Sequence, residues 1–190
     1  SARQALMTAR ADGYEAVSIA LMHAYLNPAH EERLEAMARE AGFETVVTSS
    51  AASPLIKLLP RASTTCLDAY LQPVLGEYVD RVGAGLGETP LYFMQSSGGL
   101  SAASGFRARN AVLSGPAGGV VGMARTARKA GHDQVIGFDM GGTSTDVSRY
   151  DGAHYARVEQ TQVAGQRLRA PMMAVHTVAA GGGSLLQFDG

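Results

Sequence analysis

The chain has 190 residues, of which 46% are hydrophobic and 17% charged, so it can bury a core in one or two small domains. Its formal net charge of −1 gives no electrostatic reason to bind nucleic acid or an anionic membrane, and no apolar run is long enough to cross a bilayer. The single cysteine, Cys66, excludes an internal disulfide and is typical of a reducing cytoplasm, which we take as the expected location. The chain begins without methionine and ends at Asp189-Gly190, and we expect it to be a piece of a longer polypeptide.

The first 50 residues predict a β-α-β unit. An apolar, β-branched run over 16–22 predicts a buried strand, and Asn27-Pro28 is a typical helix start. Gly42 is a typical helix end, and a second strand follows over 45–48. We therefore expect a parallel strand pair joined by a right-handed crossover.

The middle of the chain predicts a connection, a long helix and a strand. Residues 49–60 end in proline and are predicted to be a connection, and Ser63 is predicted to cap the helix that follows. Pro73 should bend or split that helix. An apolar strand is expected over 91–95, with a loop over 96–100 at its end.

A glycine-rich helix is predicted to begin at Ser114 as its N-cap and to end near Gly131. Gly118, Gly119 and Gly122 each lower helix stability by about 1 kcal/mol relative to alanine. Such a loss is reasonable where another backbone or a ligand must come close, and for Gly118 and Gly119 we favour close packing over ligand contact.

The run from Val135 to Ser148 predicts a strand, a tight loop and a second strand. Glycines in the loop bring backbone N–H groups close to an anion, and hydroxyl groups add further donors. Carboxylates at the two ends are oxygen ligands suited to Mg²⁺. The pattern predicts a nucleotide phosphate site built from Asp139, Gly141, Gly142, Thr143, Ser144, Thr145 and Asp146.

The remaining segments predict more strands and a second glycine loop. Tyr150–Ala153 has the composition of a hairpin turn, with a return strand expected over 154–161. Strands are also expected over 171–178 and 184–188, separated by the glycine loop 179–184. The two glycine loops could meet at one site. The five histidines share no metal-ligand spacing.

Three segments together resemble the hydantoinase A/5-oxoprolinase family: Gly115–Gly119, Phe138–Asp146 and Thr177–Ser184. The form of the last two is most similar to the 5-oxoprolinase branch. The resemblance implies an actin-like ATPase (ribonuclease H-like) α/β core, with a mixed β-sheet and flanking helices. Residues 1–131 would be the end of a first actin-like domain, including the junction helix, and residues 132–190 the start of a second that contains the phosphate-binding hairpin.

The resemblance also implies a chemistry, the ATP-dependent opening of a cyclic amide such as hydantoin or 5-oxoproline. Phosphorylation of the ring carbonyl oxygen would precede attack by water. Asp139 would be catalytic and would bind Mg²⁺ with Asp146, and the hairpin glycines and hydroxyls would hold the ATP phosphates. Gly181, Gly182 and Gly183 would also bind the cofactor, although packing against the junction helix is an equally good explanation for them. A second, hydantoinase B-type subunit or a fused domain is the implied partner, with no nucleic acid and no membrane.

Two alternatives to the cyclic amide hydrolase stay open at this point. One is the ATP-using subunit of a related ketone carboxylase, which shares these motifs. The other is a nucleotide-binding module without catalysis of its own. The family's first phosphate-binding loop has no copy in the 190 residues, so we expect the isolated chain to be inactive.

Overall fold

The computed structural model describes residues 1–163 and 165–188, which form a mixed α/β fold. The chain divides into two compact units, and each unit is made of three separate segments of the chain. Unit 1 comprises residues 1–91, 102–109 and 159–170, and unit 2 comprises residues 92–101, 110–158 and the chain from Pro171 onward. No helix in the described part of the chain is both long and apolar enough to span a membrane.

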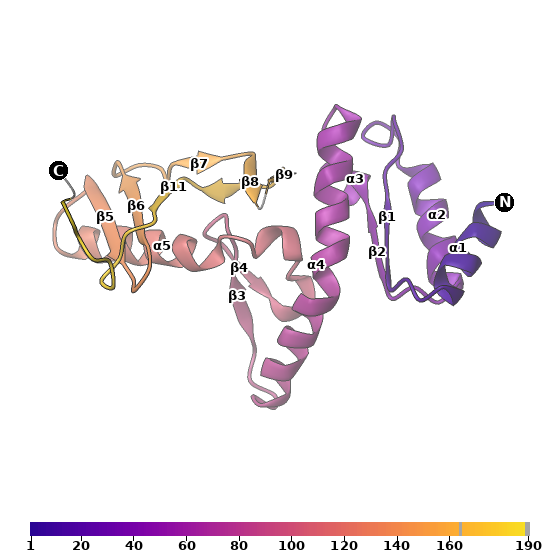
Figure 1. Cartoon of the computed structure of the whole chain (residues 1–190), viewed down its shortest axis with the longest axis horizontal. Helices are drawn as coiled ribbons and strands as arrows, with labels where there is room; N and C mark the ends of the chain where they lie inside the picture. Colours follow the sequence, from indigo (N-terminus) through magenta and orange to yellow (C-terminus); the bar gives the residue numbers. More distant parts are fainter. Residues whose placement is uncertain (164, 189–190) are drawn as a thin grey trace. The chain divides into compact units, whose positions relative to one another are not determined.

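Unit 1 begins with the predicted β-α-β unit, preceded by helix α1 (Ala2–Ala11). Strands β1 (Ala16–Ile19) and β2 (Thr45–Thr48) pair in parallel, and α2 (Ala29–Glu40) connects them (Figure 1). The Asn27 side chain accepts a hydrogen bond from the Ala29 amide at 3.1 Å, and Gly42 takes a φ of +92° just after the helix ends. The predicted boundary signals are therefore confirmed to within a residue or two.

The connection predicted over 49–60 contains helical structure instead. A short helix, α3 (Ser49–Ala52), follows β2 directly, and the long helix α4 (Leu58–Ala84) begins five residues before Ser63. Pro60 does not end the segment because it lies in the first turn of α4, where a backbone N–H has no helical partner anyway. Pro73 does not split α4, which continues through it. The capping role predicted for Ser63 is thus wrong.

A buried polar network joins α2, α3 and α4 in unit 1. The side chains of Glu31, Ser49 and Arg61 are all fully buried. The Ser49 hydroxyl donates to Glu31 Oε1 at 2.6 Å and accepts from Arg61 Nε at 2.8 Å, so it links the two charged groups. Burial alone would raise the pKa of Glu31, but hydrogen bonds from Ser49, Ser50 and the Leu21 amide outweigh it and lower the pKa below its ordinary value.

A β-hairpin late in the chain completes unit 1. Strands β8 (Thr161–Val163) and β9 (Gln166–Leu168) pair antiparallel, and β9 packs on α4. The Arg169 amide donates to Thr64 Oγ1 at 2.9 Å, which fixes the end of the hairpin to the helix. The exposed thiol of Cys66, on the same helix, lies 3.1 Å from the Ser18 hydroxyl.

Unit 2 is built on α5 (Ser114–Lys129) and a three-stranded antiparallel sheet in the order β11-β6-β5 (Figure 1). Its strands are β5 (Val135–Met140), β6 (Thr145–Tyr150) and β11 (Val175–Val178). Helix α5 packs on β5 and β6, and the core includes the buried Ala117, Val120 and Met173. The helix begins one residue earlier than predicted, since Leu113 is the cap and Ser114 is already the first helical residue.

Alternation along β5 divides its side chains between the two faces of the sheet. Gly137 and Asp139 lie on the face toward α5, and Ser148 of β6 lies on that face too. The opposite face carries large apolar side chains that are mostly exposed: Ile136 at 74%, Phe138 at 66% and Met140 at 53%.

Short strands and a buried serine fix the beginning of α5. Strand β3 (Tyr92–Met94) pairs with β4 (Leu100–Ala102), and β7 (Arg157–Val158) pairs antiparallel with β10 (Met172–Met173). Ser96, fully buried after β3, accepts from the Leu113 amide through its hydroxyl and from the Met173 amide through its carbonyl. Short 3₁₀ turns lie at Ala103–Gly105 and Ala108–Asn110.

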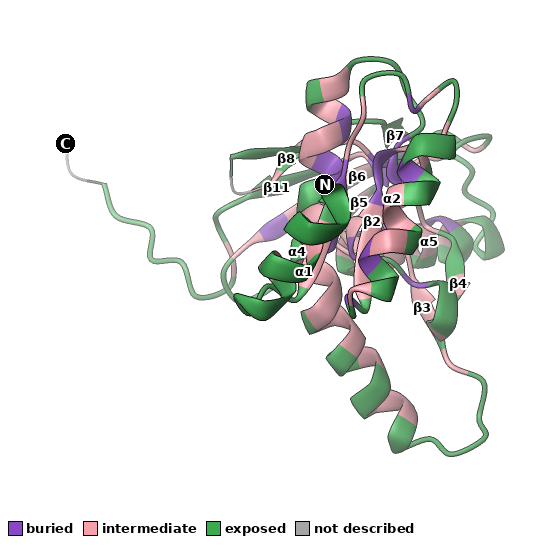
Figure 2. Ribbon diagram, turned by 90° about the vertical axis from the view of Figure 1, so that its right-hand side faces the viewer, coloured by how far each residue is buried: buried purple, intermediate pink, exposed green. Residues whose placement is uncertain are grey.

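Two strand predictions in unit 2 are wrong. The return strand expected over 154–161 does not pair back on β6: one bridge joins Tyr155 to Tyr150, and the two-residue β7 within that range pairs with β10 instead. The segment 184–188 forms no strand, and Figure 2 shows it as an exposed stretch near the C-terminal end. Its Leu185, Leu186 and Phe188 are 88%, 97% and 95% exposed, since no neighbouring strand pairs with them.

Candidate phosphate-binding site

The hairpin β5–β6 places two carboxylates directly opposite each other near its tip. Asp139 pairs with Asp146, and the next pair toward the tip is Met140 with Thr145. Both aspartates line a cavity of about 310 Å³, together with Gly119 and Val120 of α5 and Ser148 of β6. The alternation of the strands thus brings the two predicted Mg²⁺ ligands to one cavity on the helix-facing side of the sheet.

Two like charges directly opposite on neighbouring strands destabilise a sheet, and a cation between them removes this repulsion. The Thr177 hydroxyl of β11 donates to Asp146 Oδ1 at 2.6 Å, which orients that carboxylate. Within residues 1–163 and 165–188, no three His, Cys, Asp or Glu side chains form a group that could hold a metal ion. The pair could hold Mg²⁺, because that ion is commonly held by one or two carboxylates and completes its shell with water and phosphate oxygens.

Helix α5 comes close to this carboxylate pair at Gly119. A Cβ atom there would lie 3.3 Å from Asp139 Oδ2, tighter than an ordinary contact. A Cβ on Gly118 would be 3.8 Å from Met94 Cγ, and one on Gly122 would meet nothing within 4 Å. The predicted close approach is therefore found only at Gly119, and the atom that approaches there belongs to a side-chain carboxylate and not to another backbone.

The loop between the strands presents backbone amides to solvent. The Gly141 amide donates to the Ser144 carbonyl at 2.9 Å and closes the turn. The amides of Gly142, Thr143 and Ser144 have no hydrogen-bond partner in the described part of the chain. A Cβ on Gly142 would meet nothing within 4 Å, so the space above the turn is open to a ligand. Neither hairpin glycine has a positive φ, so conformational freedom does not explain them.

The second glycine loop lies against the hairpin loop. The Gly182 amide donates to the Gly141 carbonyl at 2.9 Å, and the Gly183 amide donates to the Gly142 carbonyl at the same distance. The buried Thr145 hydroxyl donates to the Ala180 carbonyl at 2.6 Å. The two glycine loops therefore meet, and the glycines of the second contact the hairpin loop.

Sequence reasoning missed two residues of this site, Thr177 and Ser184. Thr177 reaches Asp146 only because β11 pairs with β6 in the register Thr177↔Asp146. The Ser184 hydroxyl accepts a hydrogen bond from the Gly181 amide at 3.0 Å. The motif over 177–184 contained both residues, but the strand register that gives Thr177 its partner is a tertiary feature with no local signal.

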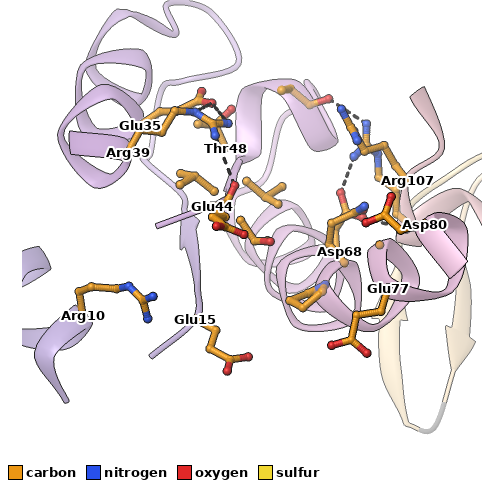
Figure 3. Close-up of a pocket in the computed structure, with 18 residues that line it drawn as sticks. Arg10, Glu15, Glu35, Arg39, Glu44, Thr48, Asp68, Glu77, Asp80 and Arg107 are labelled. Carbon is orange, nitrogen blue, oxygen red and sulfur yellow. Dashed lines mark hydrogen bonds and ion pairs between the residues drawn. The ribbon is translucent and has the colours of Figure 1, made fainter. Parts of the chain in front are cut away.

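A larger cavity of about 760 Å³ lies within unit 1, bordered by β2 and α4 (Figure 3). Its charged lining includes four arginines and six carboxylates. Arg39 is paired with Glu35, and Arg109 with the buried Asp68, so these guanidinium groups are already neutralised within the chain. The hairpin tip of unit 2, with unpaired amides, fits a phosphate better.

Comparisons with known proteins identify the family of the chain. The family model described as Hydantoinase/oxoprolinase matches residues 61–190, and that of the Hydantoinase/oxoprolinase N-terminal region matches residues 1–42. The protein is 49% identical to 5-oxoprolinase 1 of Arabidopsis thaliana over 182 residues, which are 93% of this chain and 14% of that protein. Caprolactamase subunit alpha of Pseudomonas jessenii is 37% identical over 182 residues, which are 92% of this chain and 26% of that subunit.

Two solved structures share the fold, which confirms the predicted α/β class. The ATP-dependent caprolactamase from Pseudomonas jessenii superposes with a TM-score of 0.87 at 34% identity, over 99% of this chain and 28% of that one. The nucleotide-free structure of an acetone carboxylase, which carries out ATP-dependent acetone carboxylation, superposes with a TM-score of 0.78 at 25% identity, over 95% and 27%. The chain thus spans less than a third of the length of each relative, and it belongs to the hydantoinase/oxoprolinase family.

Proposed function

We propose that this chain carries a phosphate-binding loop of an ATP-dependent cyclic amide hydrolase. The observation that carries the proposal is that one hairpin has three loop amides without a partner among the described residues and, on the strands beside that loop, two opposed carboxylates. Anions bind where several backbone N–H groups point into one open space, and Mg²⁺ accompanies nucleotide phosphates.

The roles of the residues follow from their positions. The amides of Gly142, Thr143 and Ser144 would donate to phosphate oxygens, helped by the Thr143 and Ser144 hydroxyls. Asp139 and Asp146 would hold Mg²⁺, with Asp146 oriented by Thr177. Bound ATP would supply the phosphoryl group that activates the ring carbonyl oxygen. Phosphoryl transfer depends mainly on positioning and charge neutralisation, which this tip provides.

The substrate we propose first is 5-oxoproline, because the Arabidopsis relative is a 5-oxoprolinase at 49% identity. The caprolactamase relative acts as one subunit, named alpha, which supports a partner subunit or fused domain for the complete protein. We also propose a cytoplasmic location, consistent with the single free cysteine.

A ketone carboxylase is the second candidate, favoured by the structural likeness to acetone carboxylase. It ranks lower because the caprolactamase structure superposes more closely and is more similar in sequence.

The test measures phosphate release from Mg·ATP by the complete polypeptide that contains these residues, together with its partner subunit. Release stimulated by 5-oxoproline and matched by ring-opened product is the expected result. Stimulation by a ketone and bicarbonate, with no ring opening of 5-oxoproline, hydantoin or caprolactam, would favour the carboxylase. Nucleotide binding without stimulation by any of these compounds would indicate a binding module.

A further inference from the structure

We infer that Gly181–Gly183 act as a clamp on the hairpin loop and position its phosphate-binding amides, without contacting the phosphates themselves. This inference rests on the proposed function, since it explains how the loop 141–144 is held ready for an anion. It gives these three glycines a positioning role in place of the cofactor-binding role that the family resemblance implies.

All three backbone amides of the clamp donate hydrogen bonds to acceptors within the chain. Gly182 and Gly183 donate to the carbonyls of Gly141 and Gly142, both at 2.9 Å. The Gly181 amide donates to the Ser184 hydroxyl at 3.0 Å. None of the three amides is therefore left to bind a phosphate oxygen.

Each clamp bond also orients an amide on the far side of the loop. A trans peptide is planar, and its C=O and N–H point in opposite directions. The chain contains no cis peptide bond among its described residues. Holding the Gly141 carbonyl toward the clamp therefore aims the Gly142 N–H away from it, and holding the Gly142 carbonyl aims the Thr143 N–H the same way. The clamp thus points two unpaired amides to one side, where an anion can accept from both.

The clamp requires glycine because the two backbones lie so close together. A Cβ on Gly181 would lie 2.6 Å from both Gly142 C and Thr143 N, and 2.7 Å from the Gly141 carbonyl oxygen. These are backbone atoms of the loop itself, so a side chain at 181 must displace the loop. A Cβ on Gly183 would be 3.2 Å from the Gly142 oxygen, and one on Gly182 would be 3.8 Å from the Gly141 oxygen.

The clamp is anchored where it leaves the sheet. The pair Val178↔Thr145 ends the β11–β6 ladder, and the Thr145 hydroxyl donates to the Ala180 carbonyl at 2.6 Å. Thr145 is 3% exposed, so this bond is shielded from water. The Thr145 hydroxyl therefore fixes the root of the clamp and is not free to donate to a phosphate.

The test compares Gly181→Ala, Gly183→Ala and Gly182→Ala in the complete polypeptide, with Gly122→Ala as the matched control. Gly122 lies in α5 of the same unit, and a Cβ there meets nothing within 4 Å. We expect losses in kcat for 5-oxoproline-stimulated phosphate release in the order 181, 183, 182, which is the order of the Cβ distances. Gly181→Ala should lose about 100-fold, because an error near 1 Å in positioning has effects of that size. Gly122→Ala should stay within about twofold of wild type.

Binding measurements separate positioning from general damage. Gly181→Ala should weaken binding of ATP but leave the affinity for adenosine, which has no phosphates, unchanged. An unchanged ATP affinity and kcat in Gly181→Ala would overturn the clamp, and so would an equal loss of ATP and adenosine binding. If Gly181→Ala does not fold, Gly183→Ala is compared with Gly122→Ala in the same two measurements.

The outcomes also separate the clamp from the proposed function. A wild-type protein that binds ATP without stimulation by any cyclic amide contradicts the proposed function, while the ATP and adenosine comparison still tests the clamp. A wild-type hydrolase whose Gly181→Ala variant keeps full activity contradicts the clamp and leaves the function standing.

Discussion

The two units use polar groups in opposite ways. In unit 1 the buried Glu31 and Arg61 have partners within the chain, joined through the Ser49 hydroxyl. In unit 2 the amides of Gly142–Ser144 have no partner among the described residues, and the opposed Asp139 and Asp146 face a cavity. Polar groups that satisfy one another stabilise a fold, whereas unsatisfied groups that converge on open space are suited to a ligand. The comparison predicts that mutations in the first set lower stability and mutations in the second lower activity.

The largest expected effect is that of Asp139→Asn in the complete polypeptide. In the proposed site, removing the charge of Asp139 weakens the binding of Mg²⁺, so 5-oxoproline-stimulated phosphate release should fall by at least about 100-fold. The thermal unfolding midpoint should stay close to wild type, because the Asp139 side chain is exposed. Asp12→Asn, an exposed aspartate at the end of α1, is the control. Full activity in Asp139→Asn would contradict the idea that the polar groups of unit 2 serve activity and those of unit 1 serve stability.

Ser49→Ala should produce the converse result. It leaves two buried charged groups each one hydrogen bond short, so the free energy of unfolding should fall by about 3 kcal/mol. Urea unfolding measures the change. Ser63→Ala is the matched control, since Ser63 lies in α4 of the same unit and its hydroxyl has no hydrogen-bond partner among the described residues. Equal stability of the two variants would mean that the Ser49 bridge contributes nothing.

Thr177→Val should have a smaller effect on activity. It removes the hydroxyl that orients Asp146 but keeps the shape of the side chain. Loss of such a supporting bond typically lowers metal affinity or activity about tenfold. A titration of activity with Mg²⁺ should show a higher half-saturating concentration and a partly restored rate at high Mg²⁺. An unchanged Mg²⁺ dependence would show that Thr177 does not support Asp146.

The smallest expected effect is a pH dependence of unfolding contributed by Glu31. Its pKa is lower in the folded than in the unfolded chain, so its contribution to stability is complete above the unfolded pKa and is lost as the pH falls through the folded pKa. The urea unfolding midpoint of wild type should therefore fall between neutral and acidic pH. In Glu31→Gln this fall should be smaller, because the variant has no carboxylate at position 31 to protonate. An equal fall of the midpoint in both proteins would mean that other carboxylates cause the acid dependence.

Local patterns predicted the parts of the fold that depend on neighbouring residues. The β-α-β unit, the hairpin β5–β6 and the helix end at Gly42 follow from apolar spacing, turn residues and a glycine signal. The interpretation of Pro60 was wrong because proline is equally compatible with a first helical turn.

Features that depend on tertiary pairing could not be predicted. The segment 184–188 has an apolar composition suited to a strand but no partner among the described strands. The Glu31–Ser49–Arg61 network joins three helices, and no local pattern connects those positions. At the site, the hairpin residues follow from the motif, but the contact of Thr177 with Asp146 and the bonds between the glycine loops follow only from the packed structure.

The apolar outer face of β5 has a consequence for handling the protein. Ile136, Phe138 and Met140 lie mostly exposed on one side of a strand that is itself the edge of its sheet. An edge strand of this kind is a template for pairing with other chains, and an apolar face adds a driving force that sulfate strengthens. When these 190 residues are prepared alone, light scattering should therefore rise with protein concentration and with ammonium sulfate, and Phe138→Lys should reduce that rise by placing a charge in the centre of the face.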